Sequence, residues 1–247
     1  MGEKKEGFWF MKKIYILHGW AYTTEKWQPL LDKLRSNKFE PVLLKIPGLS
    51  APLKEVWDLD DYVDWLRKGL AGEKGKVVLV GHSNGGRICL AYVSKHPERV
   101  EKVILIDSAG IYANGLPIRL KRFVFGNLAR FGRRFTDSER LRRFLYKLTR
   151  ESDYERADPV LRKTMHNLIT SDISDLLALI KVPVTIIWGE RDRMMPLKDG
   201  RMMQGLLRNA KLHVIAGARH SPMFTNVEEV GEIILKELML NMSSRTK

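Results

Sequence analysis

A chain of 247 residues is long enough for one large α/β domain, or for a core domain that carries a small insertion. Apolar residues make up 44% of the chain, which supplies a substantial core and argues against disorder. The formal net charge is +14, and a single cysteine, Cys89, excludes a disulfide within the chain.

The N-terminal region lacks the pattern of a secretory signal. Residues 1–7 are mostly charged, and the apolar stretch Phe8–Met11 is too short for a signal core and is followed by two lysines. No stretch approaches the ~20 apolar residues of a membrane span. We therefore expect a protein of the reducing cytoplasm, with Cys89 as a small buried core residue.

Short apolar runs alternate with helical periodicities along most of the chain. The apolar runs predict strands at residues 14–17, 41–46, 77–80, 103–106, 182–188 and 211–215. Apolar residues spaced three and four apart predict helices at 27–34, about 59–70, about 84–95 and about 227–240. The predicted fold class is α/β, with a mainly parallel central sheet covered by helices on both faces, because the strands are apolar throughout.

This alternation breaks between about Ile111 and Leu179. The segment has no convincing strand, but it has helical spacing, as at Leu141, Phe144, Leu145 and Leu148. We expect residues 111–179 to form a helical cap inserted into an α/β core made of residues 1–110 and 180–247.

The positive charge is concentrated in the predicted cap. Between Pro117 and Arg150 there are eleven Lys or Arg residues and only two acids, a net charge of +9. The plainest interpretation is a solvated helical face. The alternatives are an anionic substrate or an acidic carrier protein, whose association the charge would accelerate, or an anionic membrane surface. Nucleic acid is the weakest candidate, because no recognition motif accompanies the charge.

A strand, a tight turn and a helix are predicted around Ser83. The run Val77–Val80 leads directly into the G-x-S-x-G sequence of residues 81–85, and a helix-compatible stretch follows. This is the context of a nucleophile elbow, a turn so tight that Gly81 and Gly85 must lack side chains. We expect Ser83 to be a catalytic nucleophile. The alternative is an ordinary serine in a glycine-rich turn.

A serine hydroxyl needs a base, and the base needs a carboxylate that fixes its tautomer. His220 is the predicted base, because it lies in a late loop that follows the last predicted strand. The other histidines lie inside a strand, at the end of a strand, at a helix end, in the cap or beside the serine, and are weaker candidates: His213, His18, His96, His166 and His82.

The predicted acid is Asp192, which follows the strand at 182–188 through a short turn. Asp107 is its rival, because it ends the preceding strand, although a turn or helix cap also explains it. Glu190 and Asp199 are weaker candidates.

Acyl transfer also needs backbone N–H donors for the developing oxyanion. We expect one from Asn84, which follows the nucleophile, and one from Trp20 in the loop after the first strand. Gly19 permits that loop to turn toward the site, and His18 is expected to hold the loop in place rather than to react.

Together these residues resemble the α/β-hydrolase fold family over about residues 12–240. The motifs that carry the resemblance are His18-Gly19-Trp20, the segment Gly81 to Gly86, Trp188 to Asp192 with Pro196, and Gly217 to Pro222. A serine nucleophile argues against the members that attack with aspartate, such as haloalkane dehalogenases and epoxide hydrolases.

Within that family, the start of the chain, with Leu17-His18-Gly19-Trp20 and then Trp27, looks like that of the pimeloyl-acyl-carrier-protein methyl ester esterases. Those enzymes use a basic cap to hold an acidic carrier protein, so the resemblance implies such a partner here. The elbow sequence His82-Ser83-Asn84 departs from theirs. The cap is too divergent to align its arginines one by one.

The predicted function is that of a serine hydrolase that cleaves carboxylic esters through an acyl-enzyme, with Ser83, Asp192 and His220 as its triad. The same triad could act on a carbon–carbon, amide or thioester bond, or the chain could be a non-hydrolytic binding protein. We expect no metal and no cofactor, because no metal-ligand spacing, phosphate-binding loop or dinucleotide motif is present.

Overall fold

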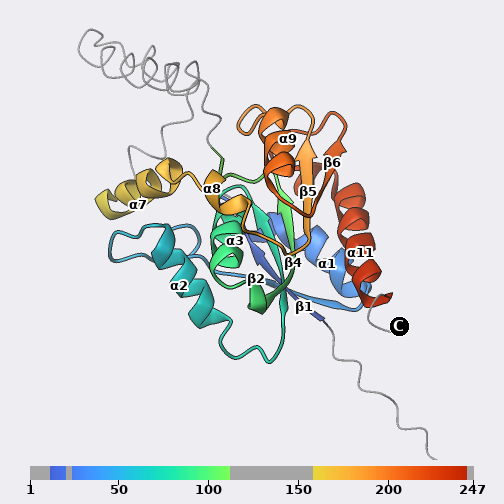
Figure 1. Ribbon diagram of the computed structural model, residues 1–247, viewed down its shortest axis with the longest axis horizontal. Coiled ribbons are helices and arrows are strands. Elements are labelled where there is room, and N and C mark those ends of the chain that lie inside the picture. Colours follow the sequence, from blue (N-terminus) through green and yellow to red (C-terminus); the bar gives the residue numbers. More distant parts are fainter. Residues whose placement is uncertain (1–11, 21–23, 112–157, 244–247) are drawn as a thin grey trace, which may run out of the picture. The chain divides into compact units, whose positions relative to one another are not determined.

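The computed structural model describes residues 12–20, 24–111 and 158–243 (Figure 1). The chain divides into two compact units. The larger contains Met1–Pro52, Leu59–Ile111 and Asp172–Lys247, and the smaller contains Leu53–Asp58 and Tyr112–Ser171.

The larger unit is built on one parallel sheet of six strands, which confirms the predicted fold class. The strands are β1 (Lys12–Leu17), β2 (Phe39–Leu43), β3 (Val77–His82), β4 (Val100–Ile106), β5 (Val184–Gly189) and β6 (Ala210–Ile215). Their order across the sheet is β2-β1-β3-β4-β5-β6, and every neighbouring pair is parallel. The inner strands β3 and β5 are buried throughout, as strands covered on both faces must be.

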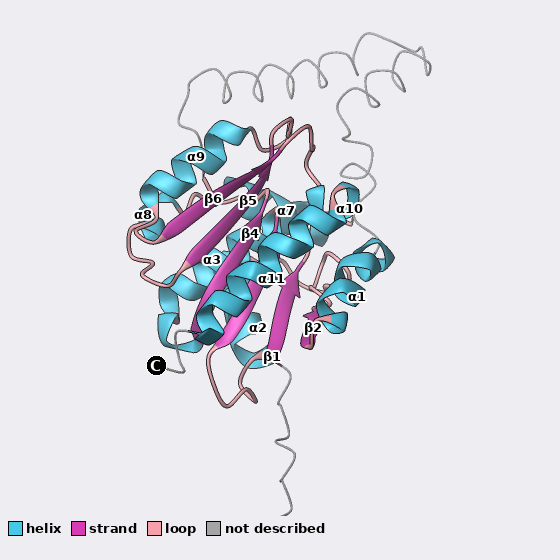
Figure 2. Ribbon diagram, turned by 90° about the vertical axis from the view of Figure 1, so that its right-hand side faces the viewer, coloured by secondary structure: helices cyan, strands magenta, loops and turns pink. Residues whose placement is uncertain are grey.

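Helices cover both faces of this sheet (Figure 2). On one face, α1 (Gln28–Ser36) and α11 (Val227–Ser243) share a continuous apolar core with the strands. The helices α2 (Leu59–Gly69), α3 (Asn84–Lys95) and α9 (Leu197–Leu206) pack on the other. Short helical segments complete the unit: η1 (Thr24–Trp27), η2 (Pro97–Arg99), α8 (Ser174–Leu177) and α10 (Pro222–Thr225).

Two elements differ from the sequence-based prediction. The strand expected at 41–46 ends at Leu43, because the carbonyl of Ile46 accepts the N–H groups of Leu49, Ser50 and Ala51 and the chain turns there. Ile46 is apolar because it is buried, not because it is part of the strand. Helix α9 was not predicted from the sequence.

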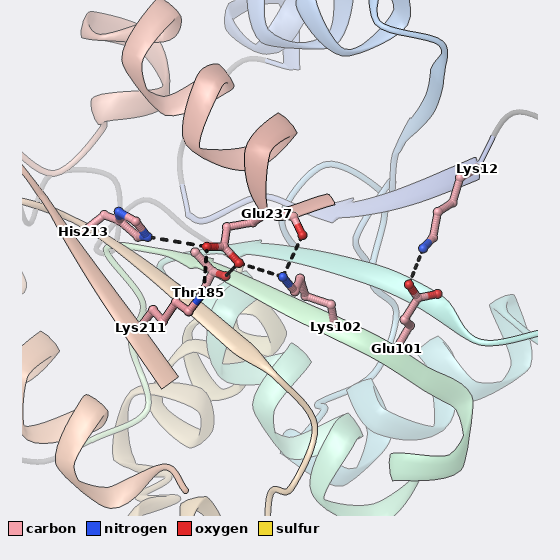
Figure 3. A network of polar contacts seen from close by, with 7 residues as sticks. All are labelled: Lys12, Glu101, Lys102, Thr185, Lys211, His213 and Glu237. Carbon is pink, nitrogen blue, oxygen red and sulfur yellow. Dashed lines mark hydrogen bonds and ion pairs between the residues drawn. The ribbon is translucent and has the colours of Figure 1, made fainter. Parts of the chain in front are cut away.

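A buried ion pair anchors α11 to the sheet (Figure 3). Lys102 of β4 donates to Glu237 of α11 twice, to the backbone carbonyl at 2.7 Å and to Oε2 at 2.8 Å. Thr185 and Lys211 also donate to the Glu237 carboxylate. Burial acts to raise the pKa of Glu237, but the two lysines outweigh burial and hold that pKa below its usual value.

The described part of the smaller unit consists of residues 53–58 and 158–171, which contain α7 (Pro159–Thr170). Asp158 caps this helix by accepting the N–H of Val160 at 2.7 Å. Thr164 and Asn167 of α7 hydrogen-bond the backbone of Trp57, which ties the two segments together. The basic segment 117–150 lies outside the described residues, and the cap at 111–179 stays a prediction.

Among the described helices, none combines the length and the apolar character that crossing a membrane would require.

Candidate active site

Ser83 is the single residue that connects β3, which ends at His82, to α3, which begins at Asn84. Its backbone has φ 52° and ψ −120°, a strained conformation for a residue with a side chain. The turn is closely packed. A Cβ at position 81 would lie 2.5 Å from Gly86 Cα, and one at position 85 would lie 2.1 Å from the Leu17 carbonyl oxygen. Only glycine fits at these two positions.

The structure brings Ser83, His220 and Asp192 into one hydrogen-bonded chain. Ser83 Oγ lies 3.2 Å from His220 Nε2, and His220 Nδ1 lies 2.7 Å from Asp192 Oδ2. All three residues are buried. With Nδ1–H donating to the carboxylate, Nε2 is free to accept the serine proton, which is the tautomer that a general base needs.

Backbone contacts hold the acid and the base in place. The second oxygen of Asp192, Oδ1, accepts the N–H groups of Met194 at 2.7 Å and Met195 at 3.0 Å. The loop of Asp192 is tied to the loop of His220, because the Arg191 N–H donates to the Ala218 carbonyl at 2.8 Å. Both oxygens of the acid are therefore committed to fixed donors.

A contact that the sequence does not predict joins the nucleophile turn to the base. His82 Nε2 donates to the backbone carbonyl of His220 at 2.9 Å. Burial, reinforced by the charge of a protonated His220, lowers the pKa of His82 to about 3, so this ring stays neutral. Its place directly before the serine is the one sequence signal that points to it.

The loop after β1 lies against the nucleophile. A Cβ at Gly19 would lie 2.8 Å from Ser83 Cβ, so the backbone passes beside the serine. His18 is buried and donates from Nδ1 to the Gly19 carbonyl at 2.8 Å, and its Nε2 lies 2.6 Å from Ser50 Oγ. Burial lowers the pKa of His18. These contacts suit a residue that holds the loop.

The expected oxyanion donors belong to the two segments that meet at Ser83, the start of α3 and the loop after β1. Asn84 is the first residue of α3, where a helical N–H has no partner within the helix. Trp20 follows Gly19 and is partly exposed. Their roles as donors stay predictions.

The rival acid Asp107 also lies beside the triad. One side-chain nitrogen or oxygen from each of Asp107, Asp192 and His220 lies within 4.8 Å of the others. Asp107 follows β4 with φ 42°, and it is fully buried. Because Asp192, rather than Asp107, bonds His220 in the structure, Asp192 is the better candidate for the acid. That no metal or cofactor is needed stays a prediction.

The weaker candidates are engaged elsewhere. Glu190 is exposed and accepts the Gly217 N–H at 2.8 Å, while Asp199 is buried in the first turn of α9. His213 of β6 lies 4.0 Å from Glu237, within the buried ion-pair network.

A family model described as the alpha/beta hydrolase fold matches residues 12–227, and the chain belongs to this family. The biotin biosynthesis bifunctional protein BioHC of Teredinibacter turnerae is 26% identical over 255 residues; the match covers 90% of this chain and 43% of that protein. The chain thus spans less than half the length of that relative.

Two further similarities cover most of both chains. A pimeloyl-[acyl-carrier protein] methyl ester esterase of Pseudoalteromonas atlantica is 25% identical, over 87% of this chain and 89% of that protein. The solved structure of a bacterial membrane phospholipase A matches with a TM-score of 0.70 and 23% identity, over 92% of this chain and 78% of that one. The chain is therefore a member of a hydrolase family with esterase and lipase relatives.

Proposed function

We propose that this protein is a serine hydrolase of carboxylic esters, with Ser83 as nucleophile, His220 as base and Asp192 as the acid that orients the base. The observation that carries the proposal is the chain of two hydrogen bonds from Asp192 through His220 to Ser83. The esterases and lipases among the relatives favour an ester over other bonds.

In the proposed reaction, Ser83 Oγ attacks the ester carbonyl carbon while its proton moves to His220 Nε2. The N–H groups of Asn84 and Trp20 stabilise the negative charge on the former carbonyl oxygen. The C–O bond to the alcohol breaks as His220 returns the proton to the leaving oxygen. A water molecule, deprotonated by His220, then attacks the acyl-enzyme, releases the carboxylic acid and restores Ser83.

A panel of p-nitrophenyl esters and a fluorophosphonate probe test this proposal. We expect turnover of the esters, and labelling that maps to Ser83. The Ser83→Ala variant should lose both, whereas the matched Ser94→Ala variant, in the same helix-and-turn region but away from the triad, should keep both. Absence of turnover and of labelling in the wild-type protein would contradict the proposal.

The same triad supports two alternatives that the sequence left open. It can act on a carbon–carbon, amide or thioester bond, or the site can bind a small molecule or protein without hydrolysing it. Faster turnover of a carbon–carbon, amide or thioester substrate than of the esters would favour the first alternative. Tight ligand binding that survives Ser83→Ala, without turnover of any substrate, would favour the second.

We also propose that the positive segment 117–150 recruits an acidic partner such as an acyl carrier protein, as the names of several relatives suggest. If so, kcat/KM for an ester carried on that protein should fall steeply with added salt, whereas kcat/KM for a small neutral ester should not. Equal salt dependence would contradict this proposal. A cytoplasmic location stays a prediction.

A further inference from the structure

Asp107 occupies a place in the sheet that brings it close to the whole triad. Its strand, β4, lies between β3, which leads to Ser83, and β5, which leads to Asp192. The Asp107 N–H donates to the Ile187 carbonyl at 3.0 Å, and the Ser83 N–H donates to the Ile106 carbonyl at 3.1 Å. The backbone of Asp107 is therefore fixed on both sides.

One oxygen of the Asp107 side chain is held and the other is not. Oδ1 accepts the Gly189 N–H at 2.8 Å. Oδ2 is buried and has no hydrogen-bond partner among the residues that the structure describes. Burying a carboxyl oxygen without a hydrogen-bond partner lowers the stability of the fold. An oxygen of this kind beside a candidate active site therefore suggests a functional role.

The acidic groups around His220 come from two different strands. Asp192 reaches it from the loop after β5, and Asp107 approaches from the end of β4, within 4.8 Å. We infer that Asp107 is a reserve positioning residue, able to accept the His220 Nδ1–H bond when Asp192 does not. A rotation of the Asp107 side chain between staggered rotamers moves the whole carboxyl group and releases the Gly189 N–H from Oδ1, while the bonds of the Asp107 backbone stay in place.

The charge state of Asp107 explains why Asp192 holds this role in the intact protein. Burial, reinforced by the negative charge of Asp192, raises the pKa of Asp107 to about 8, and the Gly189 N–H only partly offsets this. At neutral pH Asp107 is thus mostly uncharged. Removing the Asp192 carboxylate removes one cause of that shift, so Asp107 ionises at lower pH and can pair with His220.

A double-mutant cycle with Asp192→Ala and Asp107→Asn tests this inference, which rests on the proposed function. The alanine removes the acid and leaves room for Asp107. We expect kcat/KM of Asp192→Ala to fall by about 10²-fold, compared with about 10⁴-fold for complete loss of a triad acid. Asp107→Asn should cost at least about tenfold more in the Asp192→Ala background than in the wild-type background.

Two readouts separate this role from a purely structural one. The kcat/KM of Asp192→Ala should show a rising limb with pH, with a midpoint below 8, in addition to any limb that it shares with the double variant. Asp192→Asn should be less active than Asp192→Ala, because its amide fills the vacated place and favours the wrong imidazole tautomer. If the Asp192→Ala loop does not fold, Asp192→Ser leaves similar room and keeps a hydroxyl acceptor for the Met194 N–H.

Equal costs of Asp107→Asn in the two backgrounds, or the same pH profile for Asp192→Ala and for the double variant, would overturn the inference. Fluorophosphonate labelling of Ser83 in the wild-type protein identifies which proposal has failed. With Ser83 labelled, only the reserve role is overturned. Without labelling and without turnover, the proposed function fails and the reserve role fails with it.

Discussion

The imidazole of His82 donates a hydrogen bond to the backbone carbonyl of His220, 138 residues further along the chain. The residue next to the nucleophile thus fixes the loop that carries the base. The rings of the two histidines also lie with their centroids 5.0 Å apart. This buried side chain thus adds a direct link between the nucleophile turn and the base, beside the contacts that tie the His220 loop to the Asp192 loop.

His82→Ala should therefore weaken both folding and catalysis. It leaves the His220 carbonyl without its donor, at a cost of about 2 kcal/mol in the free energy of unfolding. A base displaced by a fraction of an ångström should lower kcat/KM by about tenfold. His82→Gln, which retains an N–H donor, is the control and should lose less. Thermal melts and ester kinetics measure both effects, and equal losses would contradict the role given to the bond.

His82 should also contribute to acid sensitivity. Its pKa is about 3 in the fold and 6.5 in an unfolded chain, so the unfolded state binds more protons between these values. Its contribution to stability is complete above about pH 6.5 and is lost as pH falls toward 3. Urea unfolding at several pH values should show a steeper loss for the wild-type protein than for His82→Gln. Parallel curves would contradict this.

Asp107 should have the opposite pH effect. Its pKa is raised from 3.8 to about 8, so folding is increasingly penalised as pH rises through this interval, where the unfolded carboxyl has ionised. Asp107→Asn keeps an oxygen for the Gly189 N–H and has no proton to lose. The variant should gain stability relative to the wild-type protein from pH 4 to pH 8. A constant difference across that range would show that Asp107 is ionised in the fold.

Gly19→Ala should reduce activity through the site's geometry. The new Cβ would lie 2.8 Å from both His82 Nδ1 and Ser83 Cβ, so the loop after β1 must move. A shift of about 1 Å in a catalytic site can lower kcat/KM by about 10²-fold. The matched control is Gly205→Ala in α9, where a Cβ meets nothing within 4 Å. The control should gain about 0.5–1 kcal/mol of stability and keep its activity. Similar kinetics for the two variants would contradict the close packing at Gly19.

Lys102→Met should destabilise the protein without touching the active site. It leaves the buried Glu237 carboxylate without its main partner, at a cost of about 3–5 kcal/mol in the free energy of unfolding. The combined Lys102→Met and Glu237→Leu replacement should recover most of that loss. Lys95→Met, which breaks the exposed pair with Asp60, is the control and should cost less than about 1 kcal/mol. Chemical denaturation gives all three values, and a small loss for Lys102→Met would contradict the role of the buried pair.

The order of strands and helices could be predicted from the sequence, because apolar runs and helical spacing are local signals. Helix α9 was missed because polar residues and two glycines, Gly200 and Gly205, weaken its periodicity. Its packing explains one of them, since a Cβ at Gly200 would lie 2.7 Å from the Trp188 ring. The packing of α9 against β5 and β6 thus stabilises a helix that its own sequence pattern indicates only weakly.

The three residues predicted for the triad lie together, because the ends of parallel strands meet at one edge of the sheet. The His82 bond could not be predicted, since its acceptor is a backbone carbonyl that every residue possesses. The choice between Asp107 and Asp192 likewise needed the structure, because both follow core strands and only the loop of Asp192 directs its carboxylate to His220.

The Lys102–Glu237 pair lies toward the beginnings of the strands, whereas Ser83, Asp192 and His220 follow the ends of theirs. The stabilising ion pair and the candidate triad thus lie toward opposite ends of the strands. Substitutions near the ion pair can therefore change the thermal stability of the protein while the residues around the triad stay unchanged.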